Sequence, residues 1–361
     1  MRVVVGMSGG VDSSVAAYLL RQQGHEVIGV FMNNWEETDE DGVCTAGSDW
    51  ADVRRVCQGL GIPYYSVNFA RQYRENVFEY FLAEYRRNRT PNPDVLCNRE
   101  IKFKAFLDYA LSLGADKIAT GHFAGTDCAD GKYRLLRAKD ENKDQTYFLY
   151  MLNQRALSRA LFPVAGLCKA EVRQIARDAG IPVSEKKDST GVCFIGERNF
   201  REFLKGYLPS TPGDIVTADG KTVGRHEGLM YYTLGQRRGL GIGGGGNGQR
   251  WFVTGKNVQD NQLIVEQGDD MRALYSVSAV CTEPTWIAEE PPVPFGETFR
   301  CRVRLRHRQP LQRAAATPYP DRLEIAFEEK QRAVTPGQAA VLYADQVCLG
   351  GATVDRTRGV E

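Results

Sequence analysis

The sequence has almost no net charge, few histidines and no long hydrophobic run. Its 361 residues include 46 Lys and Arg, 45 Asp and Glu and 4 His, so the formal net charge is +1. No global field draws such a protein to nucleic acid or to a membrane, and any polyanion must be held by local basic patches. No apolar run approaches the roughly 18 residues that suggest a membrane span. The opening segment, MRVVVGMSGG, has too short an apolar stretch for a secretory signal. We expect a cytoplasmic protein that does not engage membranes.

Cysteine patterns typical of zinc sites and disulfide frameworks are also missing. The 9 cysteines are scattered, with no CxxC pair and no Cys/His cluster at zinc spacing. In a reducing compartment most of them serve as small buried hydrophobic residues. Reactive cysteines must therefore be recognised by their surroundings.

The organisation of the first two hundred residues is an alternation of short apolar runs and amphipathic segments. Predicted strands cover 3–5, 27–32, 63–69 and 117–120, and predicted helices cover 11–23, 48–60, 73–89 and 98–113. This alternation predicts an α/β fold with a doubly wound parallel sheet, whose ligands bind at the carboxyl ends of the strands.

The second part of the chain has a different texture, with short alternating stretches between frequent turn signals such as PSTPGD and GIGGGGNGQ. That pattern is typical of small β-rich modules. We therefore expect a catalytic domain over 1–205, a central β-rich domain over 206–276 and a C-terminal β-barrel domain over 277–361.

The most informative segment is SGGVDSS, residues 8–14, between a predicted strand and a predicted helix. Gly9 and Gly10 let backbone N–H groups approach an anion, and the helix N-terminus adds a favourable dipole. Asp12 is a candidate ligand of Mg²⁺. No GK[ST] follows, so the segment is not a Walker A loop. Hydroxyl donors for phosphate oxygens are Ser8, Ser13 and Ser14. A plain Gly-Ser turn is the alternative.

This segment resembles the pyrophosphate loop of the N-type ATP pyrophosphatases, which split ATP between its α and β phosphates and use the AMP to activate a substrate oxygen. The resemblance implies that Met32 makes main-chain contacts to adenine and that Gly121 borders ATP. The residues it places around the nucleotide are Gly6, Met7, Ser8, Gly9, Gly10, Val11, Asp12, Ser13, Met32 and Gly121.

Two cysteines lie in segments dense with Pro, Gly, Asp and Asn. Cys97 follows TPNPDVL and precedes a predicted helix that carries Lys102 and Lys104, and a helix N-terminus with nearby cations lowers a thiol pKa. Cys193 lies in DSTGVCFIG, where glycines allow a partner to approach closely. An inert core thiol is the alternative for any single cysteine, and it suits Cys57, Cys301 and Cys348.

Seven blocks, in order over essentially the whole chain, resemble the bacterial tRNA-specific 2-thiouridylase family. They are SGGVDSS, TPNPDVLCN, TGHFA, KDQTYFL, STGVCFIG, YTLGQRRGLGIGG and TPGQAAVLY. The resemblance implies that Cys97 is the nucleophile and that Cys193 carries a persulfide. It implies contacts to the target base by Asn92, Pro93 and Asp94, with Asp94 as a general acid or base. The tRNA contacts it implies are His122, Lys143, Asp144, Gln145, Arg306, His307 and Gln338.

A run of five arginines, RCRVRLRHR over 300–308, contains no acidic residue. Strand alternation would put alternate residues on one face at a spacing of about 7 Å, which approximates successive phosphates. The expected row is Arg302, Arg304, Arg306 and Arg308. An ordinary solvated strand face is the alternative.

His122 follows the predicted strand 117–120 and Gly121, a position that favours the site over a core role. No second histidine or carboxylate lies at metal spacing, so we assign it no structural metal.

The expected reaction is ATP-dependent 2-thiolation of the wobble uridine of tRNA. ATP adenylates the C2 oxygen, and sulfur then comes from the Cys193 persulfide. Cys97 either releases sulfide or closes a Cys97–Cys193 disulfide; the sequence leaves both routes open, and a reductant must restore the thiols. The expected partners are tRNA and a sulfur-donor protein carrying a persulfide, with the enzyme acting as a monomer. Two alternatives are an adenylating enzyme that acts on a small acid or amide, and an ATP-gated RNA-binding protein.

Overall fold

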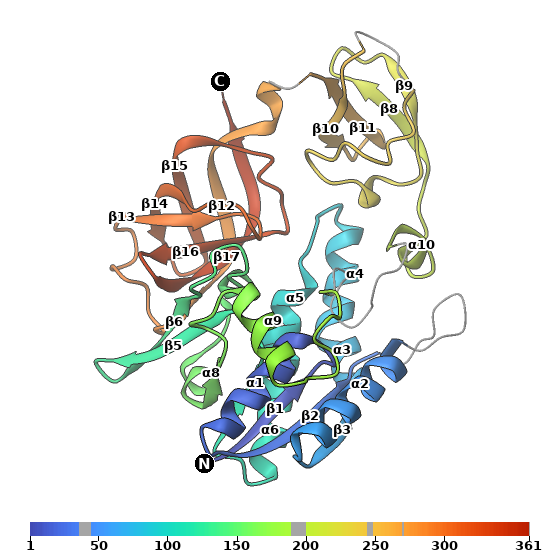
Figure 1. The fold of residues 1–361 in the computed structure, drawn as a ribbon. Coiled ribbons are helices and arrows are strands. Elements are labelled where there is room, and N and C mark those ends of the chain that lie inside the picture. Colours follow the sequence, from blue (N-terminus) through green and yellow to red (C-terminus); the bar gives the residue numbers. More distant parts are fainter. Residues whose placement is uncertain (36–44, 189–199, 244–247, 269–270, 361) are drawn as a thin grey trace.

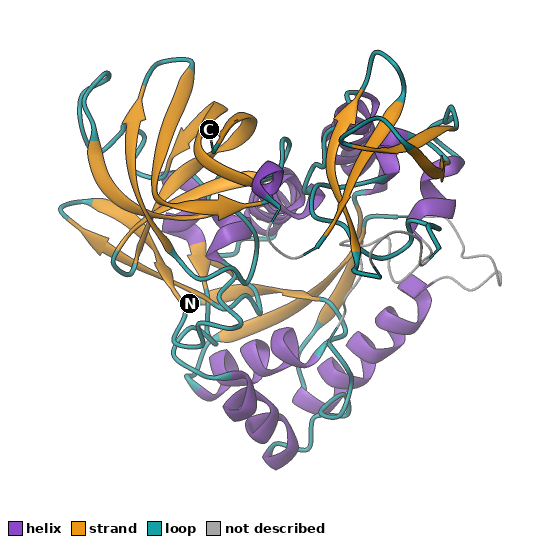
Figure 2. Ribbon diagram, turned by 90° about the horizontal axis from the view of Figure 1, so that it is seen from above, coloured by secondary structure: helices purple, strands orange, loops and turns teal. Residues whose placement is uncertain are grey.

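The computed structural model describes residues 1–35, 45–188, 200–243, 248–268 and 271–360 (Figure 1). An N-terminal α/β domain carries two β-rich parts on the same side. The barrel stands next to β5 and β6 and the smaller central sheet stands beyond α4 (Figure 1), and the two remain separate in the view from above (Figure 2). Within the described ranges, no helix is long and apolar enough to cross a membrane.

The parallel sheet is centred on β1 (Arg2–Met7) and has the order β3-β2-β1-β4-β7, with parallel pairing throughout. Its other strands are β2 (Glu26–Asn33), β3 (Tyr64–Asn68), β4 (Lys117–Ala119) and β7 (Ala160–Leu161). The predicted α/β fold with a doubly wound parallel sheet is confirmed. Because the strand order reverses between β1 and β4, a ligand site is expected outside their carboxyl ends.

The valines of β1 alternate between two hydrophobic clusters. Val3 and Val5 face α1 (Val11–Gln22), α2 (Thr45–Leu60) and α9 (Lys169–Asp178), whereas Val4 faces the helices of residues 70–112. All three side chains are fully buried. A strand covered by helices on both faces requires such a continuous β-branched run.

Two long helical segments change type along their length. The first consists of α3 (Ala70–Tyr73), the π-helical η1 (Arg74–Phe78) and α4 (Glu79–Arg86). The second consists of α5 (Pro93–Leu96), the π-helical η2 (Cys97–Ala105) and α6 (Phe106–Ser112). The second begins at Pro93 rather than at the predicted residue 98, because Asn92 Oδ1 accepts the N–H of Asp94 at 3.1 Å and proline favours the first helical position.

A hairpin of the α/β domain extends the barrel sheet, which the sequence did not predict. β5 (Ala124–Ala129) pairs with β6 (Lys132–Arg137), and β6 pairs with β17 (Val347–Gly359). The remaining helices of this domain are α7 (Thr146–Leu149), α8 (Gln154–Arg159) and α10 (Phe200–Lys205). The α/β domain and the barrel are therefore joined by backbone hydrogen bonds as well as by side chains.

The barrel closes because β12 pairs with both β15 and β17. Its strands are β12 (Tyr275–Trp286), β13 (Phe299–Arg304), β14 (Gln312–Pro318), β15 (Arg322–Arg332), β16 (Ala339–Ala344) and β17. Closure removes exposed sheet edges. Val303, Leu323 and Leu342 are among the fully buried side chains of its core.

The central sheet has the order β10-β11-β8-β9. Its strands are β8 (Gly213–Thr217), β9 (Thr222–His226), β10 (Trp251–Asn257) and β11 (Gln262–Gln267), and short 3-10 turns cover η3 (Leu229–Tyr231) and η4 (Arg272–Leu274). Ile215, Val253 and Leu263 form the centre of its own small core. β10 and β11 overlap the alternating stretches 250–253 and 263–265, whereas β8 and β9 were not predicted individually.

Candidate functional site

The SGGVDSS loop joins β1 to α1 at the carboxyl end of the central strand. α1 begins at an extended Gly10 that provides no side-chain cap, so the first-turn N–H groups face the loop. Gly9 has a φ of +73°, and a Cβ there would lie 2.7 Å from the carbonyl oxygen of Asp49. Ser14 Oγ donates to the carbonyl of Gly10 at 2.8 Å, and Ser13 Oγ accepts the N–H of Ser8 at 3.2 Å. The loop is thus a folded cradle suited to an anion.

The other predicted nucleotide contacts lie around this cradle. Gly121 approaches α1 so closely that a Cβ would lie 2.5 Å from the backbone nitrogen of Ser13. Met32 is buried at the end of β2, with its Cε 3.1 Å from where a Cβ on Gly6 would lie. The fold therefore brings together the segments 6–14, 32 and 121. Their contacts to ATP stay a prediction.

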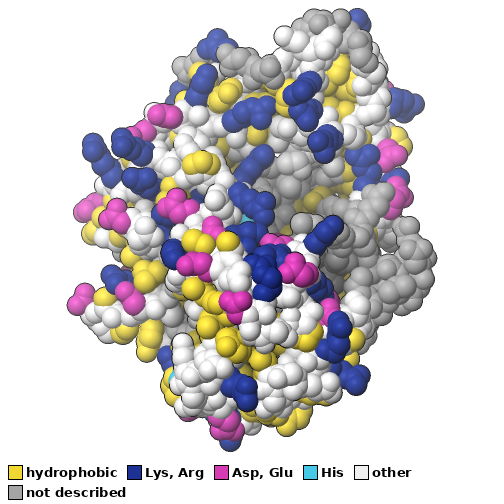
Figure 3. Space-filling view, in the orientation of Figure 1, with side chains coloured by type: hydrophobic (Ala, Val, Ile, Leu, Met, Phe, Trp, Pro, Cys, Tyr) yellow, Lys and Arg dark blue, Asp and Glu magenta, His cyan; other side chains and the backbone are white. Residues whose placement is uncertain are grey.

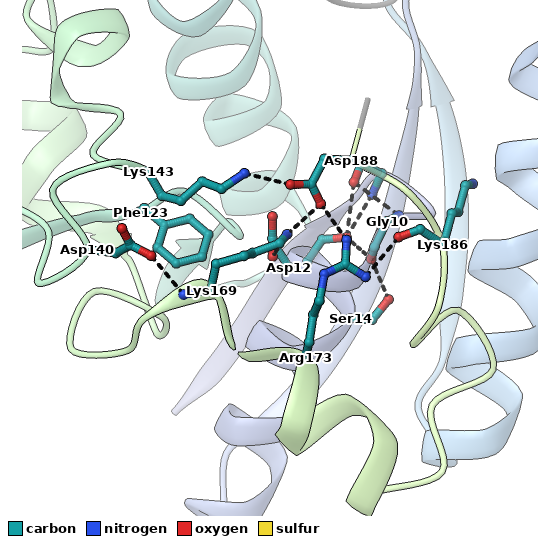
Figure 4. A network of polar contacts seen from close by, with 12 residues as sticks. Gly10, Asp12, Ser14, Phe123, Asp140, Lys143, Lys169, Arg173, Lys186 and Asp188 are labelled. Carbon is teal, nitrogen blue, oxygen red and sulfur yellow. Dashed lines mark hydrogen bonds and ion pairs between the residues drawn. The ribbon is translucent and has the colours of Figure 1, made fainter. Parts of the chain in front are cut away.

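Cationic side chains gather beside the loop (Figure 4). Lys169, the first residue of α9, places its Nζ 2.6 Å from Asp12 Oδ1 and 2.8 Å from Asp188 Oδ1. Lys143 Nζ lies 2.6 Å from Asp188 Oδ2, and Arg173 Nη2 lies 2.8 Å from Asp188 Oδ1. Lys169, Arg173 and Asp188 were not predicted as site residues, because nothing in their local sequence links them to a loop more than 150 residues earlier.

A second lysine ties the segment before Asp188 to the same loop. Lys186 Nζ lies 3.2 Å from the carbonyl oxygen of Gly9, and 2.7 Å from a carboxylate oxygen of each of Asp49 and Asp52 on α2. Lys186 thereby fixes residues 186–188 against the loop.

The two carboxylates of this cluster titrate in opposite directions. Burial raises the pKa of Asp12 and outweighs the opposing charge of Lys169. Burial also acts on Asp188, but hydrogen bonds from Lys143 and Lys169 outweigh it and hold the pKa of that carboxyl well below its usual range. Asp188 is therefore ionised under all ordinary conditions, and its charge is available to these cations.

Asp12 was predicted to hold Mg²⁺. Among the described residues, no group of three or more His, Cys, Asp or Glu side chains could hold a metal ion. Mg²⁺ commonly uses one or two carboxylates together with substrate phosphates and water. Asp12 could therefore bind Mg²⁺ only together with the phosphates of a bound nucleotide. In the structure its carboxylate forms an ion pair with Lys169.

Cys97 does not lie in a loop before a helix, so that prediction is wrong. Because the helix begins at Pro93, Cys97 is the first residue of η2, and its side chain is fully buried in the large core cluster. Lys104 is paired with Glu100 at 2.7 Å. The Cys97 sulfur is therefore not exposed to solvent in this structure. Cys193 lies outside the described residues.

A cavity of about 400 Å³ lies between the helical segment that begins at Pro93 and the barrel. Its lining includes Asn92 and Arg99 from the helical segment, Tyr80 from α4 and Glu283 from β12. Asn92, Val95 and Leu96 thus border an open space, whereas Cys97 is not part of its lining. The base contacts predicted for residues 92–94 stay a prediction.

His122 lies just beyond β4, as its position in the sequence indicated. Its side chain is 9% exposed, and Nδ1 lies 2.8 Å from Thr120 Oγ1. Burial lowers the pKa of His122 well below its usual value. The imidazole is therefore neutral, which suits hydrogen bonding to a base better than pairing with a phosphate.

The side chains of Lys143, Asp144 and Gln145 point to three different parts of the protein. Lys143 contacts Asp188, Asp144 contacts Arg304 of the barrel, and Gln145 contacts the backbone next to His122. Asp144 is buried, and its Oδ2 accepts from Arg304 at 2.7 Å. Gln145 Oε1 accepts the N–H of Phe123, next to His122, at 2.9 Å. The Asp144 carboxylate is thus engaged in an internal ion pair, and the tRNA contact predicted for this segment stays a prediction.

The predicted row of four arginines is also wrong. β13 ends at Arg304, which is 3% exposed, and the chain then turns. Arg306 donates to the carbonyls of Leu234 and Ala333, at 3.1 and 2.8 Å. The exposed basic residues of β13 and its neighbour β14 are Arg300, Arg302 and Arg313. In Figure 3, Lys and Arg side chains gather where the barrel faces the central domain.

Gln338 and His307, which were also predicted to contact tRNA, have these partners in the structure. Gln338 Nε2 donates to the carbonyl of Thr90, two residues before Asn92, at 2.7 Å. The His307 ring lies 4.5 Å from that of Phe148, between centroids, and burial lowers its pKa. Gln338 thus helps to position the chain that leads to Cys97, and its contact with tRNA stays a prediction.

Comparisons with known proteins agree with this architecture. Family models match residues 1–197 (tRNA methyl transferase HUP domain), 201–267 (tRNA methyl transferase PRC-barrel domain) and 278–354 (Aminomethyltransferase beta-barrel domain). The tRNA-specific 2-thiouridylase MnmA of Alkaliphilus oremlandii is 57% identical over 98% of this chain and 97% of its own length. The protein of the same name in Bacillus subtilis is 56% identical over 98% and 95%. A solved 4-thiouridine synthetase–RNA complex with bound ATP is 18% identical, with a TM-score of 0.37 over 58% of this chain and 50% of that chain.

The parallel sheet and the loop at its switch point define a nucleotide-binding α/β enzyme with two β-rich domains attached. With identity of this level over nearly the full length of both proteins, the chain belongs to the tRNA-specific 2-thiouridylase family, whose members are tRNA sulfurtransferases.

Proposed function

We propose that this protein replaces the C2 oxygen of the wobble uridine of tRNA by sulfur, with ATP as the activating substrate. The observation that carries the proposal is the folded SGGVDSS loop at the uncapped start of α1, faced by Lys169, in a chain that is 57% identical to a 2-thiouridylase. The loop and the helix N-terminus supply N–H donors for phosphate, and the nearby cations supply positive charge.

The proposed chemistry separates activation from sulfur transfer. Transfer of AMP to the C2 oxygen releases pyrophosphate and converts a poor leaving group into a good one. Sulfur then comes from a persulfide on Cys193, which a partner protein loads. Asp94, in the first turn of α5, is the proposed acid or base.

Two routes for the sulfur remain in the proposal. In one, the terminal persulfide sulfur attacks C2, AMP leaves, and the Cys97 thiolate then breaks the bond between the Cys193 sulfur and the transferred sulfur. In the other, Cys97 first attacks the Cys193 sulfur and releases hydrogen sulfide, which attacks C2. Both routes end in a Cys97–Cys193 disulfide, so an external dithiol must reduce the enzyme after each turnover.

The buried position of Cys97 adds a requirement to both routes. Its fully buried thiol must become accessible before it reacts, and the Asn92–Leu96 part of the segment borders the cavity next to the barrel. Binding of the anticodon loop near that cavity would supply the energy for such a movement.

The test is a reconstituted reaction of protein, tRNA, ATP, Mg²⁺ and a low-molecular-weight persulfide. We expect AMP and pyrophosphate to form only with tRNA present, together with 2-thiouridine. Asp12→Ala should abolish AMP formation while tRNA binding is retained, because it alters the phosphate loop only. A small-molecule adenylating enzyme would form AMP without tRNA, and an ATP-gated RNA-binding protein would form none.

A further inference from the structure

Asp188 is the centre of an unusual concentration of positive charge. Lys143, Lys169 and Arg173 lie 2.6 to 2.8 Å from its two oxygens. Lys169 also pairs with Asp12, so three cations share two carboxylates. A polyphosphate carries more charge and more acceptor oxygens than a carboxylate, and the guanidinium fork suits it well.

The cluster directly adjoins the loop proposed to bind the nucleotide. Lys169 contacts Asp12 of the loop, and Lys186 contacts the carbonyl of Gly9. Asp188 and Lys186 belong to one short segment: Lys186 contacts the loop itself, and Asp188 is linked to it through Lys169, which pairs with Asp12 (Figure 4). A nucleotide whose pyrophosphate rests on this loop at the start of α1 would place those phosphates next to these side chains.

Two of the three cations are partly exposed to solvent, whereas the side chain of Lys169 is 13% exposed. The side chains of Lys143 and Arg173 are 29% and 25% exposed, and that of Asp188 is 34% exposed. The ion pairs therefore form at an open edge of the domain, where an incoming anion can compete with the carboxylate. A buried structural ion pair such as Arg304–Asp144, at 4% and 0% exposure, offers no such access.

We propose that Lys143, Lys169 and Arg173 bind the pyrophosphate portion of ATP, and that the Asp188 carboxylate occupies these cations until the nucleotide displaces it. This inference rests on the proposed use of ATP. It gives Lys143 a role at the nucleotide, in place of the tRNA contact predicted from the sequence. It also makes Asp188 an internal competitor that lowers the affinity for pyrophosphate.

The test measures binding of inorganic pyrophosphate and of AMP to the full-length protein by isothermal titration calorimetry. Asp188→Asn should tighten pyrophosphate binding about fivefold or more, since removing the competitor raises the binding-competent fraction. AMP affinity should be unchanged. Glu185→Gln is the matched control, because it removes the same charge from an exposed side chain three residues away. It should leave both affinities unchanged.

A second variant tests the cations without altering Asp188. Lys143→Met should weaken pyrophosphate binding about fivefold or more and leave AMP binding unchanged. The control is Lys187→Met, at the exposed position next to Asp188, which should change neither affinity. If Asp188→Asn fails to fold, Lys143→Met decides alone. Unchanged or weaker pyrophosphate binding in folded Asp188→Asn, or unchanged binding in Lys143→Met, would overturn the inference. Failure of the wild type to bind ATP or AMP would instead overturn the proposed function.

Discussion

Arg304 of the barrel and Asp144 of the α/β domain form a buried ion pair, with Nη1 2.7 Å from Oδ2. Asp144 also accepts from Thr146 Oγ1, and the Arg304 guanidinium lies 5.5 Å from the ring centroid of Tyr343. The pair therefore fastens the two domains at the point where the arginine-rich strand ends.

Breaking this pair should destabilise the protein strongly. Asp144→Asn leaves the Arg304 charge buried without its counter-ion, which typically costs about 3–5 kcal/mol. Chemical denaturation should show that loss in the free energy of unfolding. Arg302→Met, at an exposed position of the same strand, should change it by less than about 0.5 kcal/mol. Equal effects of the two variants would show that the pair is not structural.

The exposed arginines of the barrel should bind tRNA backbone phosphates. Arg302 lies directly opposite Arg313 in the β13–β14 pairing, and both are exposed. Like charges in that arrangement repel, and a polyanion relieves the repulsion. Replacing both with Ala should reduce the slope of log affinity against log salt by about 2. The charge-matched control is Arg21 and Arg54 to Ala, on exposed positions of α1 and α2. An unchanged slope would show that these two arginines do not bind tRNA phosphates.

Lys256 should make stability depend on pH. Its Nζ donates to the carbonyl of Asn88 in the α/β domain at 2.9 Å, and burial lowers its pKa from 10.5 to about 8. Since the folded pKa lies below the unfolded one, folding releases a proton between these values, and the contribution of Lys256 to stability rises with pH across that window. Thermal unfolding of wild type and Lys256→Met should show an advantage of the variant that is largest below about pH 8 and shrinks above it. A pH-independent difference would contradict the burial of this amine.

The two cysteines should fail at different steps. Cys193→Ser should still release pyrophosphate in the presence of tRNA but make no thiouridine. Cys97→Ser should accept a persulfide on Cys193 and not complete transfer. The wild type, turned over without reductant, should yield a cross-linked Cys97–Cys193 peptide pair by mass spectrometry. Cys128→Ser, at an exposed cysteine, should behave as wild type. Continued thiolation by Cys193→Ser with persulfide as the sole sulfur source would show that another cysteine carries the sulfur.

The sequence was sufficient for features that depend on local patterning. The β-branched run of β1 and the loop after it lie where the patterns placed them, and the second part of the chain is β-rich as its turn signals indicated. The start of the helix at Pro93 was missed, because the cap by Asn92 competes with the expectation of a proline-rich loop. As a result, Cys97 was expected in an accessible segment and is instead buried.

Contacts between segments that are far apart in the chain could not be predicted from the sequence. Strand alternation predicts that Arg302 and Arg304 share a face, and they do, but it cannot show that the α/β domain covers only the second. Likewise, no local signal joins Lys169 or Asp188 to the loop at residues 8–14. Such pairings are set by how the helices pack on the sheet, and they appear only in the folded chain.

The most direct measurement of the proposed activity quantifies nucleosides and nucleotides in one reconstituted reaction. The purified protein is incubated with unmodified tRNA, ATP, Mg²⁺, a persulfide donor and a dithiol, and the digested tRNA is examined by mass spectrometry. We predict 2-thiouridine at the wobble position, with one AMP and one pyrophosphate released for each sulfur incorporated. Formation of AMP without 2-thiouridine, or of 2-thiouridine without consumption of ATP, would contradict the proposed function.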